Sequence, residues 1–212
     1  MEAVIFDFDG TIMDTESLWY EVYRDTLLEE YKYSLKIEDF SKVIGTVDDL
    51  LMDQLKKEIG EQFDRDWLEK LAGEEFKRKK DILAVREGIM ELIRYFQEKG
   101  YKLAIASSSR RKWIQLHLEA FQLTSYFPII VSSDDVERVK PDPELYVKAL
   151  EKLNVRAVDA MAIEDSGHGA TAAIGAGIRT FVVPNPVTAH LKFPVEASVF
   201  EDFWELLSEL NG

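Results

Sequence analysis

The chain of 212 residues contains no cysteine and only three histidines. Without cysteine it can form no disulfide bond, no thiol nucleophile and no cysteine-ligated zinc or iron–sulfur site. The histidines, His117, His168 and His190, lack the spacing of metal ligands, and we expect each of them at the surface. Any bound metal ion would be held by oxygen ligands in preference to histidine nitrogen.

Positive charge and long apolar runs are also scarce. Lysine and arginine number 26 against 40 aspartates and glutamates, so the formal net charge is -14. Such a chain is poorly suited to neutralise nucleic-acid phosphates or to bind an anionic membrane surface. No apolar run reaches the roughly 18 residues of a membrane span, and the first residues show no secretory leader. We expect a cytoplasmic protein without nucleic-acid or membrane partners, and we take it to be a monomer.

The hydrophobic content of 46% is enough to bury the core of one domain with a modest insertion. Five short apolar runs are followed by segments whose apolar residues recur at helical spacing, the pattern of a parallel sheet covered by helices. The expected strands are Val4–Phe6, Leu103–Ala106, Ile129–Val131, Met161–Ile163 and Phe181–Val183. The predicted fold class is therefore α/β, with a Rossmann-like open parallel sheet.

The connection after the first strand is far longer than the few residues usual in such folds. It contains three amphipathic stretches, and their apolar residues are Leu18, Trp19, Val22, Tyr23 and Leu27, then Leu50, Leu51, Leu55 and Ile59, then Trp67, Leu68 and Leu71. Residues 16–81 are predicted to form an inserted all-helical domain. Residues 1–15 and 82–212 would form the α/β core, with hinges near Thr15 and Ala84.

A pair of acids follows the first predicted strand. Asp7 and Asp9 are two residues apart, and residues two apart in a strand point to the same face. At about 4 Å and an effective dielectric constant near 20, repulsion between the two carboxylates is on the order of 4 kcal/mol. A bound cation would relieve this repulsion, so the pair favours a metal site.

Polar residues follow three more of the predicted strands, namely Ser107–Ser109 after the second, Lys140 after the third and Glu164–Asp165 after the fourth. Each cluster taken alone is explained by a turn, a helix cap or a solvated side chain. However, the carboxyl ends of parallel strands meet at one edge of the sheet, where ligands bind in open α/β folds. Four clusters at that edge favour a single functional site.

Four sequence motifs resemble those of the haloacid dehalogenase-like hydrolases in order and spacing. They are Asp-Phe-Asp-Gly-Thr at 7–11, Ala-Ser-Ser-Ser at 106–109, Lys-Pro-Asp-Pro-Glu at 140–144 and Glu-Asp-Ser-Gly-His-Gly at 164–169. The helical insert is similar to the cap domain of the branch that contains β-phosphoglucomutase and related sugar-phosphate and nucleotide phosphatases. The resemblance implies a magnesium-dependent phosphatase that hydrolyses monoesters of small phosphorylated metabolites.

The resemblance also implies roles for individual residues. Asp7 would be the nucleophile that forms an aspartyl-phosphate, and Asp9 would protonate the leaving oxygen and later take a proton from water. Magnesium would be bound by Asp7, the backbone carbonyl of Asp9 and Asp165, with Glu164 orienting its waters. The remaining residues expected to act on the phosphate are Ser107 and Lys140, which are catalytic, and Ser108, Arg110, Gly10 and Thr11.

The cap is expected to contact the rest of the substrate. By resemblance, residues 44–48, which include Gly45 and Thr46, form a loop that points at the active site. β-Phosphoglucomutases carry a histidine near the position of Trp19 and an arginine near that of Asp48, and this chain has neither. Hydrolysis is therefore favoured over a mutase reaction, which stays an alternative.

Two further alternatives come from other functional classes. The stretch Gly167–Ala172 matches the G-x-G-x-x-A motif of dinucleotide-binding proteins. Glu164 and Asp165 would repel a pyrophosphate there, and no acid follows at the distance expected for a ribose ligand. A non-catalytic binding protein on the same fold is the other alternative, and the presence of both Asp7 and Asp9 argues against it.

Overall fold

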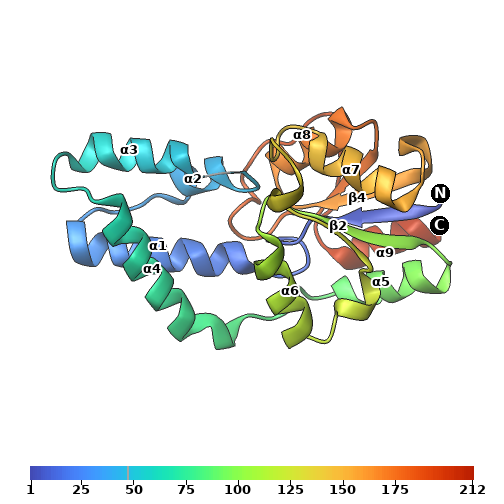
Figure 1. The fold of residues 1–212 in the computed structure, drawn as a ribbon, viewed down its shortest axis with the longest axis horizontal. Coiled ribbons are helices and arrows are strands. Elements are labelled where there is room, and N and C mark those ends of the chain that lie inside the picture. Colours follow the sequence, from blue (N-terminus) through green and yellow to red (C-terminus); the bar gives the residue numbers. More distant parts are fainter. Residues whose placement is uncertain (47) are drawn as a thin grey trace.

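The computed structural model describes residues 1–46 and 48–212, with Asp81 described by its backbone alone. In this part of the chain, a six-stranded sheet and its covering helices occupy one end of the molecule, and helices from the inserted segment occupy the other (Figure 1). No helix among the described residues is both long and apolar enough to cross a membrane.

The sheet is entirely parallel, in the order β3-β2-β1-β4-β5-β6. Its strands are β1 (Ala3–Phe6), β2 (Lys102–Ala106), β3 (Ile129–Val131), β4 (Ala160–Glu164), β5 (Arg179–Val182) and β6 (Ser198–Val199). All four residues of β1 are buried because helices cover both faces of the sheet, which explains its unbroken apolar run. The predicted α/β fold with a parallel sheet is confirmed. Since β1 lies between β2 and β4, the chain changes direction across the sheet beside β1, where ligands bind in such folds.

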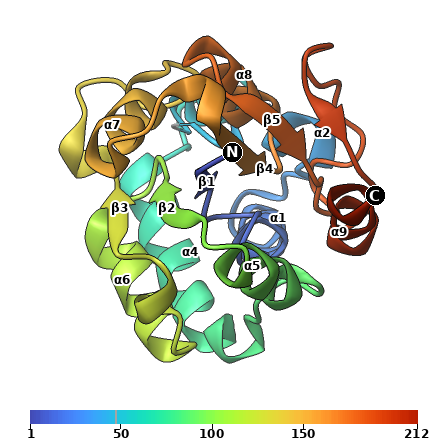
Figure 2. The same ribbon diagram turned by 90° about the vertical axis from the view of Figure 1, so that its right-hand side faces the viewer.

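Helices on the two faces of the sheet bury alternate residues of β1. Val4 and Phe6 belong to the cluster packed by α5 (Ile89–Glu98), α6 (Arg111–Ala120) and α9 (Phe203–Asn211). Ala3 and Ile5 belong to the cluster packed by α7 (Glu144–Leu153) and α8 (Gly167–Gly175) (Figure 2). Short 3-10 helices connect the elements at Ser41–Val43, Lys80–Ile82, Thr124–Tyr126, Ser133–Asp135 and Ala157–Asp159.

The inserted segment is helical, as predicted. Its helices are α1 (Thr15–Tyr31), α2 (Ile37–Phe40), α3 (Asp49–Ile59) and α4 (Arg65–Lys79). The ring of Trp19 on α1 stacks on the ring of Phe76 on α4, with 4.2 Å between the ring centroids. The centroid of the Phe76 ring lies 5.4 Å from that of Trp113 on α6. These aromatic contacts join the helical layer to the α/β core. The domain boundaries near residues 15 and 82 stay a prediction.

Some apolar residues of the predicted stripes are exposed. Leu50 is 68% exposed and Trp67 is 43% exposed. Each helix of this layer has one buried face, which in α3 is filled by Leu51 and Leu55 and in α4 includes Leu68. Leu50 and Trp67 belong to the amphipathic stretches but lie outside the buried faces of their helices.

Two further predictions need correction. Strand β6 and helix α9 follow the last predicted strand, and the two residues of β6 are too few to mark a strand in the sequence. His117 is buried rather than at the surface, because its place three residues after Ile114 puts it on the inner face of α6. Its Nδ1 lies 2.9 Å from the carbonyl oxygen of Trp113.

Candidate active site

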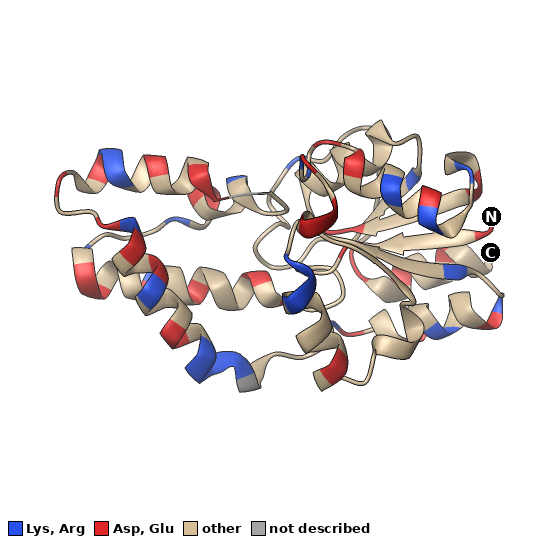
Figure 3. Ribbon diagram, in the orientation of Figure 1, with Lys and Arg blue, Asp and Glu red and all other residues tan. Residues whose placement is uncertain are grey.

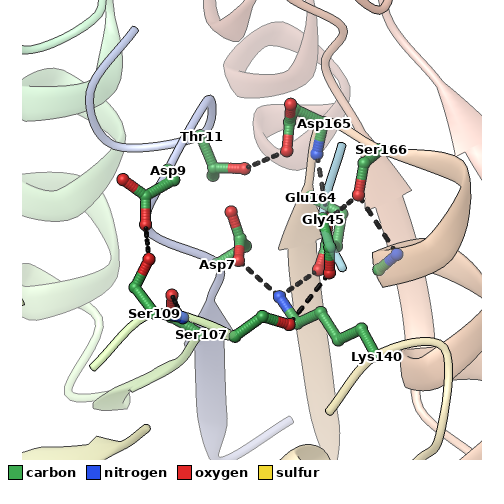
Figure 4. A network of polar contacts seen from close by, with 12 residues as sticks. Asp7, Asp9, Thr11, Gly45, Ser107, Ser109, Lys140, Glu164, Asp165 and Ser166 are labelled. Carbon is green, nitrogen blue, oxygen red and sulfur yellow. Dashed lines mark hydrogen bonds and ion pairs between the residues drawn. The ribbon is translucent and has the colours of Figure 1, made fainter. Parts of the chain in front are cut away.

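The parallel strands bring the predicted site residues together at one edge of the sheet. The register pairs Phe6, the last residue of β1, with Ile105 of β2 on one side and with Ile163 of β4 on the other. Asp7 directly follows β1, Ser107 directly follows β2, and Glu164 is the last residue of β4. Lys140 enters from the loop between β3 and α7. Figure 4 shows these side chains close to one another, with dashed lines joining Lys140 to Asp7 and to Glu164.

The buried side chain of Lys140 lies between two carboxylates. Its Nζ donates to Oδ1 of Asp7 and to Oε1 of Glu164, the latter at 2.7 Å. The buried hydroxyl of Tyr146 donates to the same Glu164 oxygen at 2.6 Å. Burial acts to lower the pKa of Lys140, but the charges of Asp7 and Glu164 outweigh burial and raise that pKa above its ordinary value. Lys140 is therefore held as a cation inside the site.

Asp7 is almost completely buried, with 5% of its surface exposed. Burial is the main reason that the pKa of Asp7 is raised from 3.8 to about 7, with Lys140 acting against it and Glu164 adding to it. A shift of this size beside a charged partner is typical of residues that do chemistry.

Asp165 is held by two donors from distant parts of the chain. Thr11 Oγ1 donates to its Oδ1 at 3.2 Å, and Asn185 Nδ2 donates to its Oδ2 at 2.7 Å. Gly10 packs directly on this carboxylate with φ of +83°, and a Cβ there would lie 2.3 Å from Asp165 Oδ2. Burial and then the charge of Asp7 raise the pKa of Asp165 well above its ordinary value. Both the conformation and the close contact require glycine at position 10.

The carboxylates at this edge can hold a metal ion. One oxygen from each of Asp7, Glu164 and Asp165 lies within 4.8 Å of the others, and all three residues are buried. The single ammonium group of Lys140 cannot balance three buried carboxylates, and oxygen ligands of this kind suit a hard divalent cation. Because Glu164 already accepts from Lys140 and Tyr146, Asp7 and Asp165 are better placed as direct ligands.

The Asp9 carboxylate is turned to the other side of the site (Figure 4). Its Oδ2 accepts from Ser109 Oγ at 2.6 Å, and its Oδ1 accepts from Thr15 Oγ1 at 2.9 Å and from Trp113 Nε1 at 2.8 Å. These donors come from the core and from the first residue of the inserted helices. The orientation of Asp9 therefore depends on how both parts are placed.

A cavity of about 250 Å³ opens between Asp7, Asp9 and the inserted helices. Its remaining lining residues are Glu16, Trp19, Gly45, Thr46, Ser107, Ser108, Ser109 and Trp113. The predicted cap loop thus reaches the cavity through Gly45 and Thr46. Val47, which belongs to the same predicted loop, lies outside the described residues.

Polar contacts hold the cap loop against the core. Ser108 Oγ donates to the carbonyl oxygen of Gly45 at 2.9 Å. The Nδ1 of His168 lies 3.0 Å from the carbonyl oxygen of Ile44, and Ser41 Oγ lies 3.0 Å from Nε2 of His190. In this arrangement the inserted helices cover the cavity.

Of the predicted phosphate- and substrate-binding residues, Ser107, Ser108, Gly45 and Thr46 line the cavity, whereas Gly10, Thr11, Lys140 and Arg110 do not. Arg110 is exposed and, among the described residues, does not belong to the lining of the Asp7 cavity. The side chain of Thr11 binds Asp165. The roles proposed for both residues stay predictions.

The sequence interpretation missed several residues of the network. Asn185 comes shortly after β5, so the same strand-end rule that pointed to the other clusters could have found it. Tyr146 and Trp113 lie on apolar helix faces and carried no polar signal. Ser109 was counted in its motif but given no partner, and in the structure it binds Asp9.

Comparison with known proteins gives the family. The model of the haloacid dehalogenase-like hydrolases matches residues 4–183. The chain is 38% identical over 194 residues to YhcW of Bacillus subtilis (strain 168), which is provisionally named a phosphatase, covering 91% of this chain and 88% of that protein. It is 36% identical over 184 residues to a phosphorylated carbohydrates phosphatase of Thermotoga maritima, covering 84% and 82% of the two chains.

A solved structure shows the same fold over the whole chain. CbbY from Rhodobacter sphaeroides, crystallised with phosphate, superposes with a TM-score of 0.80 at 27% identity, and each chain is covered completely. The α/β core, the helical insert and the family match over most of the chain identify a hydrolase. The chain belongs to the haloacid dehalogenase-like hydrolases.

Proposed function

We propose that this phosphoric monoester hydrolase is a Mg²⁺-dependent phosphatase that acts on small phosphorylated metabolites. The observation that carries the proposal is the position of buried Lys140 between Asp7 and Glu164, beside a cavity that also contains Asp9. A phosphate monoester resists attack because its anionic oxygens repel nucleophiles and its alkoxide leaves poorly. A nucleophile and a proton donor in one cavity, with a buried cation bound to the nucleophile, meet these requirements. The phosphatase names of the Bacillus and Thermotoga relatives support the proposal.

The reaction would take place in two steps. In the first, a carboxylate oxygen of Asp7 forms a bond to phosphorus while the bond from phosphorus to the alcohol oxygen breaks, and Asp9 gives its proton to that oxygen. In the second, water attacks phosphorus, Asp9 takes the proton of the water, and the bond to Asp7 breaks. Phosphate leaves and both residues return to their starting state.

Other residues would hold the phosphoryl group during these steps. Lys140 offsets the charge of Asp7 and of the phosphate, and Ser107 donates a hydrogen bond to a phosphoryl oxygen. Mg²⁺ would be held by Asp7, Asp165 and the backbone carbonyl of Asp9, and when bound it supplies further neutralisation of phosphoryl charge. Through its bonds to Lys140, Glu164 positions that cation.

Additional contacts are proposed at the rim of the site. Ser108 and the backbone of Gly10 and Thr11 would contact the phosphate, and Arg110 would do so if its exposed side chain turns inward. Gly45 and Thr46, which line the cavity, would contact the alcohol part of the substrate.

The surroundings of Asp48 favour hydrolysis over a mutase reaction. Asp48 is paired with Arg65 at 3.0 Å, and Arg65 also binds Asp49 and Glu69 at 2.8 and 2.5 Å. A mutase must hold a second phosphate at the cap. Here that phosphate would meet Asp48 beside an arginine already bound to three carboxylates.

Hydrolysis of p-nitrophenyl phosphate with and without Mg²⁺ tests the proposal. The wild type should be active only with the metal, and Asp7→Asn should be inactive, whereas Asp66→Asn, which changes an exposed aspartate of α4, should keep its activity. Asp9→Asn should accumulate phosphorylated protein, which intact-mass spectrometry would detect. Turnover by Asp7→Asn near that of the wild type would exclude Asp7 as the nucleophile.

A further inference from the structure

The cavity beside Asp7 continues into a second hollow within the inserted helices. This hollow has a volume of about 330 Å³ and shares Glu16, Trp19, Gly45 and Thr46 with the first. Its other lining residues are Tyr23, Phe40, Val43, Ile44 and Asp48. A phosphate at Asp7 would leave the alcohol part of its ester to occupy this second space.

The lining of both hollows is acidic. Among the residues that the structure describes, it includes the carboxylates of Asp7, Asp9, Glu16 and Asp48 but no lysine or arginine. Burial and the charges of Asp9 and Asp7 raise the pKa of Glu16 well above its ordinary value. Because a raised pKa favours the neutral carboxyl, Glu16 is not counted as a fixed negative charge of the lining, whereas Asp7 and Asp48 are.

The basic residues of the inserted helices do not reverse this potential. The guanidinium of Arg65 is bound to three carboxylates, one of which is Asp48. The basic stretch Lys77–Lys80 at the end of α4, visible in blue in Figure 3, is mostly exposed and lies outside the lining of both hollows. Neither group is placed to bind an anion on the substrate.

At the catalytic end of the cavity, the positive charges do not exceed the negative charges either. With Asp7, Glu164 and Asp165 ionised, Asp9 protonated as the first step requires and Lys140 protonated, the formal charge of these groups is two negative units. A divalent cation reduces it to zero, and a phosphate dianion returns it to two negative units. A second anion on the substrate would therefore add repulsion on both sides.

We propose that the alcohol part of the natural substrate carries no negative charge. The enzyme then selects phosphate esters of neutral or cationic alcohols and rejects phosphorylated hydroxy acids, diphosphates and bisphosphates. This inference rests on the proposed phosphatase function. The aromatic faces of Trp19 and Tyr23 suit such a group, because they pack against the C–H face of a polyol or attract an ammonium. Neutral and cationic alcohols have in common that they carry no anion. The experiment below distinguishes between these two kinds of alcohol.

Three phosphate esters of nearly equal size differ in the charge of the alcohol part. It is neutral in 2-hydroxyethyl phosphate, cationic in 2-aminoethyl phosphate and anionic in 2-phosphoglycolate. We expect kcat/KM for 2-phosphoglycolate to be at least roughly tenfold below that for the hydroxyethyl ester. A faster amino ester would assign a cationic alcohol, and a faster hydroxyethyl ester a neutral one. A carboxylate ester hydrolysed as fast as the neutral ester would overturn the inference.

A substitution in the acidic lining of the second hollow tests where the charge selection arises. Asp48→Asn should raise the rate on 2-phosphoglycolate relative to 2-hydroxyethyl phosphate by about threefold or more. The matched control, Glu61→Gln, removes an exposed carboxylate from the loop between α3 and α4 and should leave the ratio unchanged. Equal rate ratios in Asp48→Asn and Glu61→Gln would show that the acidic lining does not select substrates by charge.

A binding measurement separates this inference from the proposed function. With Mg²⁺ present, 3-hydroxypropylphosphonate should raise the melting temperature more than 3-phosphonopropionate, which replaces the hydroxymethyl group by a carboxylate. If p-nitrophenyl phosphate is hydrolysed but the carboxylate analogue binds and its ester reacts equally well, the charge selection fails and the phosphatase function stands. If no ester is hydrolysed, the function fails, and the phosphonate pair still decides whether the pocket discriminates by charge.

Discussion

Replacing Asp7 by asparagine should stabilise the metal-free protein at alkaline pH although it abolishes activity. Burial raises the pKa of Asp7 from 3.8 to about 7. Between these pH values the folded protein keeps a proton that the unfolded chain has released, so this residue makes the free energy of unfolding fall as pH rises from about 4 to about 7. A shift of about three units corresponds to on the order of 4 kcal/mol in total. The asparagine variant lacks this cost.

Urea unfolding in EDTA at about pH 5 and about pH 8 measures the effect. From about pH 5 to about pH 8, the free energy of unfolding of the wild type should fall by about 3 kcal/mol more than that of Asp7→Asn. Lys140 keeps Glu164 as its partner at 2.7 Å, so the variant does not leave a buried charge unpaired. Saturating Mg²⁺ should then stabilise the wild type more than the variant, since the metal loses a ligand. A stability difference between the two proteins that is equal at both pH values, within about 0.5 kcal/mol, would refute the reasoning.

Three further substitutions test other contacts. Tyr146→Phe removes a buried donor to Glu164 and should lower the free energy of unfolding by about 1.5–3 kcal/mol in urea, and a change under about 0.5 kcal/mol would contradict this bond. Gly169→Ala would place a Cβ 2.0 Å from the Glu164 carboxylate and should reduce both stability and kcat. In contrast, the Cβ of Gly73→Ala would meet no neighbouring residue within 4 Å, so this variant should stabilise helix α4 by about 0.5–1 kcal/mol. Similar unfolding curves for the two variants would contradict this packing. Ser108→Ala removes a bond to the cap loop and should raise KM by about three- to tenfold with less effect on kcat, so an unchanged KM would show that the bond does not help to hold the cap.

The sheet could be predicted because its signal is local. The strands β1, β2 and β4 are buried almost throughout and are therefore unbroken apolar runs in the sequence. Their parallel arrangement follows from the helical segments between them, and it sends the residues after each strand to one edge. Asp7, Ser107 and Glu164 are for this reason expected together, and the structure places all three at that edge, with Asp7 and Glu164 joined through Lys140.

The partners of these residues could not be predicted in the same way. Asp9 accepts a hydrogen bond from Ser109, which is 100 residues away, and from Trp113, which resembles an ordinary core residue in the sequence. Tyr146 lies on the apolar face of α7, and only the packing of that helix against the sheet shows that its hydroxyl reaches Glu164. Helical periodicity reports which face is buried, but not which polar atom lies opposite it.

The amino-acid sequence by itself determined the buried strands, the place of each acid relative to them and the absence of any cysteine chemistry, because these depend on residue type and short-range spacing. Tertiary structure alone decided that Lys140 is enclosed by Asp7 and Glu164 and that Arg65 is occupied by Asp48 and its neighbours. Burial and pairing are set by groups distant in the chain, and they control the charge that a site presents to its substrate.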